Sequence, residues 1–430
     1  MMLLVYTKSL TPRINYTFKH VCTNILGLEV EFTSKIEAFI AHEDMKLSYG
    51  KQKMGNEFFV QQKGLLLEQG YTDTDIRVGK WDDTPCFFKV GESSDLPFDI
   101  FSASFYMLSR YEEYLPHVKD KTGRFPSNES LAVKKKFIDK PVVDIWAYKF
   151  KEHLQEKFPS FDFPEKKFRN KNILSVAQAY KYRKKGLVRS VGASLRDIFQ
   201  LNLNNLVDRF KVLLFLKNDP YEIYDELVAF SKKEKIRWNF MFQLSNYSVN
   251  NKNISYNKIK YHALIKSMAD YGKIGLLPGF EATKSFKTLK TEKKRWEAIV
   301  NRPLTSALVK HYDINLPQLY NNFDKLEIQE DYSMVFADVI GFRAGTCTPF
   351  LFYDINLERI SPLVLQPSVI NSDIFSELTY FELKTKLEKI KLAVEKVNGK
   401  LVLLFENANF EDERTKEKLL KLIYALNKTE

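Results

Sequence analysis

Cysteine and long apolar runs are both scarce in this sequence of 430 residues. Its three cysteines, Cys22, Cys86 and Cys347, lie far apart and form no CxxC pair, which excludes a zinc ribbon and a disulfide framework. No stretch approaches the roughly 18 uninterrupted apolar residues of a membrane-spanning helix. The first residues, Met1–Thr7, carry a short apolar run without a basic stretch before it or a cleavage site after it, so they predict a β-strand. We therefore expect a cytoplasmic protein without a membrane span.

Glycine and proline are also few, with 16 and 15 residues, while 44% of the chain is hydrophobic and 28% is charged. This composition excludes wholesale disorder and fibrous structure, and the length suits two or three domains with a sizeable core. Lys and Arg exceed Asp and Glu by 12, a basic excess that favours polyanionic partners such as anionic glycans or lipid head groups. A nucleic acid partner is not expected.

The pattern of the chain divides near the segment 158–172, which combines two prolines with a charge run and has no hydrophobic period. Before it, short strand-like runs accompany a helical stretch at Pro12–Leu26 and two amphipathic helices at Phe98–Leu115 and Val143–Phe158. The sequence thus predicts a smaller α+β domain over residues 1–165 and a second domain over residues 166–430.

The second domain alternates strand and helix patterns, which is typical of an α/β protein with βα units around a parallel sheet or barrel. The predicted strands are Ile173–Val176, Ile236–Leu244, Lys273–Leu277, Tyr332–Phe336 and Leu401–Phe405. The predicted helices are a long helical region ending at Leu216, then Pro220–Lys233, Lys258–Ala269, Leu289–Asn301, Tyr380–Val397 and Glu413–Leu426.

Five segments resemble the two-domain bacterial polysaccharide deacetylase family, which joins an uncharacterised amino-terminal domain to a NodB-homology domain. They are PFDIFSASFYMLSRYEEYLPHVKDKTGRFPSNESLA (97–132), KPVVDIWAYK (140–149), DPYEIYDEL (219–227), EDYSMVFADVIGFRAGTCTPFLFYDI (330–355) and KVNGKLVLLFEN (396–407). Their order matches the family over nearly the whole chain. The resemblance implies that the second domain is a distorted (β/α) barrel. It also implies a family reaction, metal-assisted removal of an acetyl group from a sugar amide.

The family reaction needs an Asp and two His to hold a divalent metal, a second Asp as general base and a further His as general acid. This sequence departs from the pattern at all five positions. Ser175 stands for the base, Ala177 for the ligand Asp, Leu277 and Lys310 for the ligand His residues, and Glu406 for the acid. None of Ser, Ala and Leu can perform these roles at neutral pH. The resemblance therefore predicts the fold, a catalytically degenerate site and no metal cofactor.

The residues around these positions match the family, among them Tyr180, Arg343 and Asn407. Arg343 and Asp338 either still shape a polar pocket or form a buried ion pair inherited with the fold, and we favour the second interpretation.

Glu406, His311 and Asp313 offer a way to rebuild a hydrolytic or metal centre at the barrel mouth. His311 is displaced by one residue from the ligand position at Lys310, so on a strand its side chain would point to the opposite face.

Our leading hypothesis is a pseudoenzyme that binds a glycan, or a partner such as an active paralogue, in polysaccharide metabolism. One alternative is a hydrolase with relocated chemistry at Glu406, Asp313 and His311. Another is a protein that binds polyanions through the basic run Lys181–Arg189, for which a solvated surface is the simpler interpretation.

Overall fold

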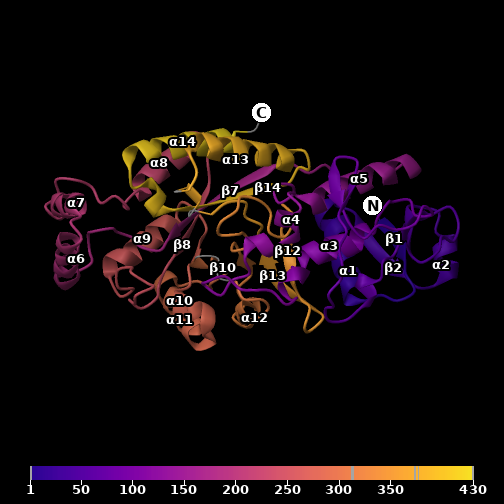
Figure 1. The fold of residues 1–430 in the computed structure, drawn as a ribbon, viewed down its shortest axis with the longest axis horizontal. Coiled ribbons are helices and arrows are strands. Elements are labelled where there is room, and N and C mark those ends of the chain that lie inside the picture. The colour runs from indigo at the N-terminus through magenta and orange to yellow at the C-terminus, as the bar shows by residue number, and fades with distance from the viewer. Residues whose placement is uncertain (1, 311–313, 372–373, 376, 429–430) are drawn as a thin grey trace.

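A computed structural model describes residues 2–310, 314–371, 374–375 and 377–428 of the chain. The amino-terminal part lies at one end of the elongated molecule, and the barrel with its covering helices occupies the rest (Figure 1). The predicted fold class is confirmed: the chain is α/β, with a distorted (β/α) barrel preceded by a smaller mixed domain.

The amino-terminal part is built on a four-stranded sheet with the order β2-β1-β3-β4. Its strands are β1 (Met2–Tyr6), β2 (Glu29–Thr33), β3 (Lys46–Gly50) and β4 (Phe58–Gln61). All three pairings are parallel. The connections from β1 to β2 and from β2 to β3 each cross through a helix, whereas residues 51–57 join β3 to β4 without one. The expected α+β mixture therefore consists of a parallel sheet together with a separate antiparallel ribbon of β5 (Gly79–Trp81) and β6 (Thr84–Cys86).

Helices cover this sheet and connect it to the barrel. They are α1 (Pro12–Phe18), continued by a π-helical turn at Lys19–Ile25, then α2 (Ile36–Ala41), α3 (Ile100–Leu108), α4 (Leu131–Lys134) and α5 (Val142–Lys157). The first begins where the sequence predicts it, because the Thr11 hydroxyl accepts a hydrogen bond from the Ile14 amide and Pro12 fits the first helical position.

The barrel consists of seven parallel strands in the order β13-β11-β10-β9-β8-β7-β14, with β12 antiparallel on the outer side of β13. They are β7 (Arg169–Val176), β8 (Trp238–Phe242), β9 (Ile274–Leu276), β10 (Ser306–Ala307), β11 (Glu330–Asp331), β12 (Phe350–Asp354), β13 (Arg359–Leu365) and β14 (Lys400–Glu406). The segment after β13 closes the ring onto β14, since the Val369 amide donates to the Val402 carbonyl at 3.1 Å and the Leu404 amide to the Ile370 carbonyl at 3.2 Å.

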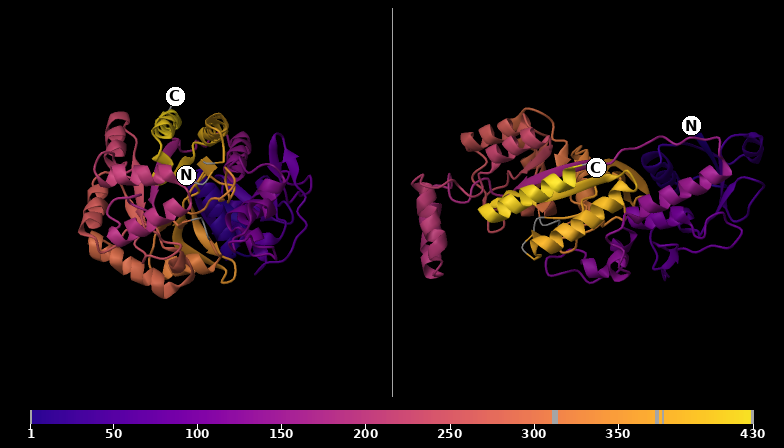
Figure 2. Two further views of the ribbon diagram at one scale, coloured as in Figure 1. Left: turned by 60° about the vertical axis from the view of Figure 1, so that its left-hand side comes forward. Right: turned by 90° about the horizontal axis from the view of Figure 1, so that it is seen from above.

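Helices surround the barrel, and α13 and α14 pack on each other over the β7–β14 side (Figures 1 and 2). The barrel helices are α6 (Leu187–Phe199), α7 (Leu203–Leu213), α8 (Tyr224–Glu234), α9 (Ile259–Ala269), α10 (Phe280–Lys284), α11 (Phe286–Val300), α12 (Gln318–Lys325), α13 (Tyr380–Glu395) and α14 (Glu413–Asn427). No helix in the described part of the chain is long and apolar enough to cross a membrane.

A buried ion network joins the amino-terminal part to the barrel. Glu113 lies just after α3, and its carboxylate accepts two hydrogen bonds from the Arg343 guanidinium, at 2.9 and 2.7 Å, and one from Arg110 at 2.7 Å. Arg110 also donates to the backbone carbonyl of Arg343 and to Glu112. Because both guanidiniums and the carboxylates are almost fully buried, each charge depends on its partners.

Removing the Glu113 carboxylate should strongly destabilise the fold, because two buried guanidiniums would lose a partner. We expect Glu113→Ala to lower the free energy of unfolding by about 3–5 kcal/mol in urea titrations. As a control, Glu129→Ala removes a solvent-exposed ion pair with Lys134 and should cost less than about 1 kcal/mol. Equal effects of the two substitutions would contradict this role of Glu113.

The same network predicts an acid dependence of stability. Burial opposes ionisation of Glu113, but the Arg343 and Arg110 guanidiniums outweigh it and lower its pKa to about 2. An unfolded Glu titrates near 4.3, so the contribution of Glu113 is present above about pH 4 and is lost as the pH falls toward 2. Glu113→Gln should lack this component of the acid transition.

Candidate functional site

The five degenerate positions belong to the carboxyl-terminal end of the barrel strands, where sites of (β/α) barrels are built. Side chains alternate along β7, so Ile173, Ser175 and Ala177 share the face that points into the barrel. The Ser175 hydroxyl donates to the Phe405 carbonyl of β14 at 3.1 Å. It therefore ties two neighbouring strands together.

Ala177 and Leu277 are buried inside the barrel, each with 1% of its surface exposed. Both belong to one apolar cluster, whose other members are Ile173, Met241, Leu308, Tyr332, Val335, Val402 and Leu404. Neither side chain has a donor atom for a metal, and the surrounding groups are mostly hydrocarbon. The residues at these two positions do not fit the divalent metal that the resemblance implies.

Glu406 ends β14 and caps the short 3₁₀ helix Asn407–Phe410. Its carboxylate accepts a hydrogen bond from the Asn409 amide, and its own amide donates to the Asn409 side chain at 2.8 Å. Lys310, which follows β10, is half-buried. His311 and Asp313 lie outside the described residues. In the described part of the chain, no three His, Cys, Asp or Glu side chains are grouped so that they could hold a metal ion.

Asn407 and Tyr180 hold the loops at this end of the barrel. Asn407 is fully buried and donates to the Gln178 carbonyl at 2.8 Å and to the Tyr221 carbonyl at 3.2 Å. Tyr180 is 2% exposed, with the Lys184 ammonium 3.7 Å from its ring centroid, and burial raises the pKa of its hydroxyl. Both side chains are buried and contact the loops at the carboxyl-terminal end of the barrel.

Arg343 and Asp338 do not pair with each other. Arg343 forms the buried ion pair with Glu113 described above, and Asp338 accepts a hydrogen bond from the Ser127 hydroxyl at 2.6 Å. Asp338 lines a separate cavity of about 710 Å³ between residues 133–139 and α13. The two residues thus both contact the amino-terminal part of the chain, through different partners.

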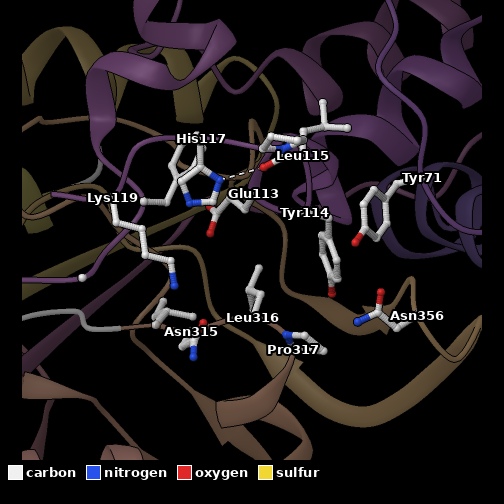
Figure 3. Close-up of a pocket in the computed structure, with 14 residues that line it drawn as sticks. Tyr71, Glu113, Tyr114, Leu115, His117, Lys119, Asn315, Leu316, Pro317 and Asn356 are labelled. Atoms are coloured by element: carbon white, nitrogen blue, oxygen red, sulfur yellow. Dashed lines mark hydrogen bonds between the residues drawn. The ribbon is translucent and has the colours of Figure 1, made fainter.

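A cleft opens where the Glu113 segment meets the barrel (Figure 3). It has a volume of about 390 Å³, within the size range of small-molecule sites. Tyr71, Tyr114 and Phe125 supply aromatic surface, and the polar groups come from Glu113, His117, Lys119, Asn315 and Asn356. The rings of Tyr71 and Tyr114 lie 5.8 Å apart, and the His117 ring is held by a 2.8 Å contact between its Nδ1 and the Leu115 carbonyl.

This cleft is the site that the sequence reasoning missed. Two segments form most of its wall: residues 113–125 of the amino-terminal part, which belong to the segment 97–132 of the resemblance, and Asn315–Pro317 of the barrel. The two segments lie on opposite sides of the predicted boundary at residue 165, and only the fold brings them together.

Comparison with known proteins gives a family model for the amino-terminal part alone. Residues 3–159 match a family of unknown function, DUF7033. No curated protein matches the chain.

Among solved structures, the chain is similar to a putative polysaccharide deacetylase from Mycobacterium smegmatis, with 11% identity and a TM-score of 0.41 over 63% of this chain and 87% of that one. It is also similar to a pseudoenzyme of the CE4 family from Bacillus anthracis, with 9% identity and a TM-score of 0.32 over 60% of each chain. A Puue allantoinase has 9% identity and a TM-score of 0.37 over 60% of this chain and 84% of its own. Identities this low say nothing about the residues of the site.

Restoring the acidic residue at position 177 should destabilise the barrel, because a carboxylate would enter the apolar cluster unpaired. We expect Ala177→Asp to lower the urea midpoint more at pH 8 than at pH 5, since burial raises the folded-state pKa and stability is lost as the pH rises above the unfolded value. Ala177→Asn, which has a similar shape and no charge, should show no such pH dependence. Equal losses for Asp at both pH values would mean that water or a cation reaches this position.

Proposed function

We propose that this protein is a deacetylase-like pseudoenzyme that binds an N-acetylated glycan in the cleft between its amino-terminal part and its barrel. It would hold no resident metal and would carry out no deacetylation. The observation that carries this proposal is the pairing of a closed, apolar barrel interior at Ala177 and Leu277 with an open cleft nearby.

The chemistry of the cleft suits a saccharide. Sugar rings have apolar faces that pack on aromatic side chains, and hydroxyl and amide groups that need hydrogen-bond partners. Tyr71 offers a ring and a hydroxyl, and Tyr114 offers its ring, while Asn315 and Asn356 offer side-chain amides that can donate and accept (Figure 3). In Figure 3 Asn356 lies on the same side of the opening as the two tyrosines, and Asn315 lies on the other side.

The buried ion network supports binding here because it fixes one wall of the cleft. Glu113 lines the cleft while its carboxylate is held by Arg343 and Arg110, so the adjoining Tyr114–His117 segment is anchored before any ligand arrives. Because this wall of the cleft is already ordered, binding a ligand would cost less conformational entropy.

A hydrolase with relocated residues is less well supported by the same geometry. Glu406 is engaged as the cap of the Asn407–Phe410 turn. Two of the three metal-ligand positions, Ala177 and Leu277, are occupied by hydrocarbon.

Isothermal titration with chitotetraose, an oligomer of N-acetylglucosamine, tests the proposal. We expect binding in the presence of a chelator, without release of acetate. Tyr71→Ala should weaken binding about five- to tenfold, because the loss of one aromatic contact is worth about 1 kcal/mol. Tyr424→Ala is a matched control, since Tyr424 on α14 is exposed to a similar extent, 42% against 44% for Tyr71.

Two outcomes would contradict the proposal. One is the absence of binding to chitotetraose and to a peptidoglycan fragment alike. The other is binding that Tyr71→Ala leaves unchanged, which would place the glycan elsewhere on the protein.

A further inference from the structure

The helices α6 and α7 form a hairpin that stands away from the body of the protein. They are consecutive in the chain and are joined by residues 200–202, with Leu201 in a left-handed conformation at φ +55°. The hairpin lies at the end of the molecule opposite the amino-terminal part (Figure 1), and the view from above shows it separated from the barrel helices (Figure 2).

The hairpin exposes an apolar stripe on both helices. On α6 the exposed residues Val191, Leu195 and Ile198 follow the spacing of one helical face, and Phe199 extends it. On α7 the same holds for Leu203, Val207 and Phe210, and Leu214 directly after the helix extends the stripe. The most exposed side chains are Phe199, at 85%, and Leu201, at 83%, and both lie at the tip of the hairpin.

The hairpin buries an ion pair on its inner side, next to Val212. Asp197 of α6 and Arg209 of α7 form an ion pair that is almost fully buried. The Tyr182 hydroxyl donates to Asn205 at 3.3 Å. A soluble helix pair normally buries its apolar stripe and exposes its charges. Here the apolar stripe stays exposed while an ion pair is buried, which indicates that the stripe contacts a medium other than water.

Basic residues accompany the stripe. Residues 181–217 contain nine Lys and Arg and two Asp, a net charge of +7 in a chain whose total is +12. At the base, Lys181 pairs with Glu411, and Arg183 and Lys184 pair with Glu222. Farther out, Arg196 and Lys211 are exposed and have no ionic partner among the described residues. Part of the basic run Lys181–Arg189, which the sequence predicts to face solvent, thus forms ion pairs that attach the hairpin to the rest of the protein.

We propose that this hairpin binds the surface of a membrane that contains anionic lipids. Its apolar stripe would enter the boundary between head groups and acyl chains, with the tip residues Phe199 and Leu201 deepest, while Arg196 and Lys211 contact the anionic head groups. With 13 and 11 residues, the two helices are too short to span the bilayer and would lie in its interface. A second copy of the chain is the less suitable occupant, because it would bring an equal positive charge to the contact.

This inference goes beyond the proposed glycan function and does not depend on it. The hairpin shares no residue with the cleft of Figure 3.

Flotation of the full-length protein with vesicles tests the inference. We expect binding to vesicles of equal parts phosphatidylglycerol and phosphatidylcholine, weakened by high salt, and little binding to phosphatidylcholine alone. The double substitution Phe199→Ser and Leu201→Ser should reduce the partition coefficient by about tenfold or more. Arg196→Glu with Lys211→Glu should reduce it to a similar extent. Phe381→Ser is the control, because Phe381 is 77% exposed on α13, outside the hairpin.

A second measurement detects insertion of the hairpin into the membrane, in a variant that keeps an apolar side chain at its tip. The chain has four tryptophans, and all are buried, so a Phe199→Trp variant adds one exposed indole. Quenching of its fluorescence by brominated lipids would report contact with the acyl region.

Several outcomes would overturn the inference. They are the absence of binding to anionic vesicles, equal binding to neutral vesicles, and binding or quenching that does not change with these substitutions. Light scattering can reveal one further contradicting outcome. If the wild type is a dimer that does not bind vesicles, and the double substitution Phe199→Ser and Leu201→Ser makes it a monomer, the hairpin is a contact between two copies of the chain.

Discussion

The contact between Glu113 and Arg343 connects the two halves of this protein. A carboxylate and two guanidiniums are buried together, and the desolvation cost of each is offset only by the others. The interaction fixes the end of α3 against the loop between β11 and β12. The cleft lined by Glu113, Tyr114 and Asn315 exists because of this docking. Assembly of the site therefore depends on the interface between the parts.

Packed side chains and backbone hydrogen bonds hold the barrel in shape. Its interior is filled by side chains from β7, β8 and β14 and from the loops that follow β9, β10 and β11. The ring is closed by backbone hydrogen bonds between residues 369–370 and β14. Positions 177 and 277, which the resemblance assigns to metal ligands, contribute to this packing. Hydrocarbon side chains at these two positions stabilise the barrel, because they bury apolar surface at close packing.

The strongly periodic parts of the chain were predictable from the sequence, whereas the local irregularities were not. The strands at Ile173–Val176 and Leu401–Phe405 and the helices beginning at Tyr380 and Glu413 are confirmed within one or two residues at most ends. The strand predicted at Tyr332–Phe336 is wrong, because pairing stops at Asp331, whose buried carboxylate accepts hydrogen bonds from Ser333 and turns the backbone. The role of Glu113 was hidden because its partner, Arg343, lies 230 residues away. The long helical region before Leu216 divides into two helices at residues 200–202. Its exposed apolar stripe has the same period as a buried helix face, so the sequence pattern does not distinguish the two.

Calorimetric titration of zinc, and then of cobalt, into chelator-stripped protein at neutral pH tests the central claim most directly. Glu406→Ala and His311→Ala proteins should be titrated beside the wild type. The account predicts no tight stoichiometric binding in any of the three, because the barrel interior at Ala177 and Leu277 offers no metal ligand. Tight binding of one metal ion per chain that either substitution abolishes would mean a rebuilt metal centre, and the pseudoenzyme account would be wrong.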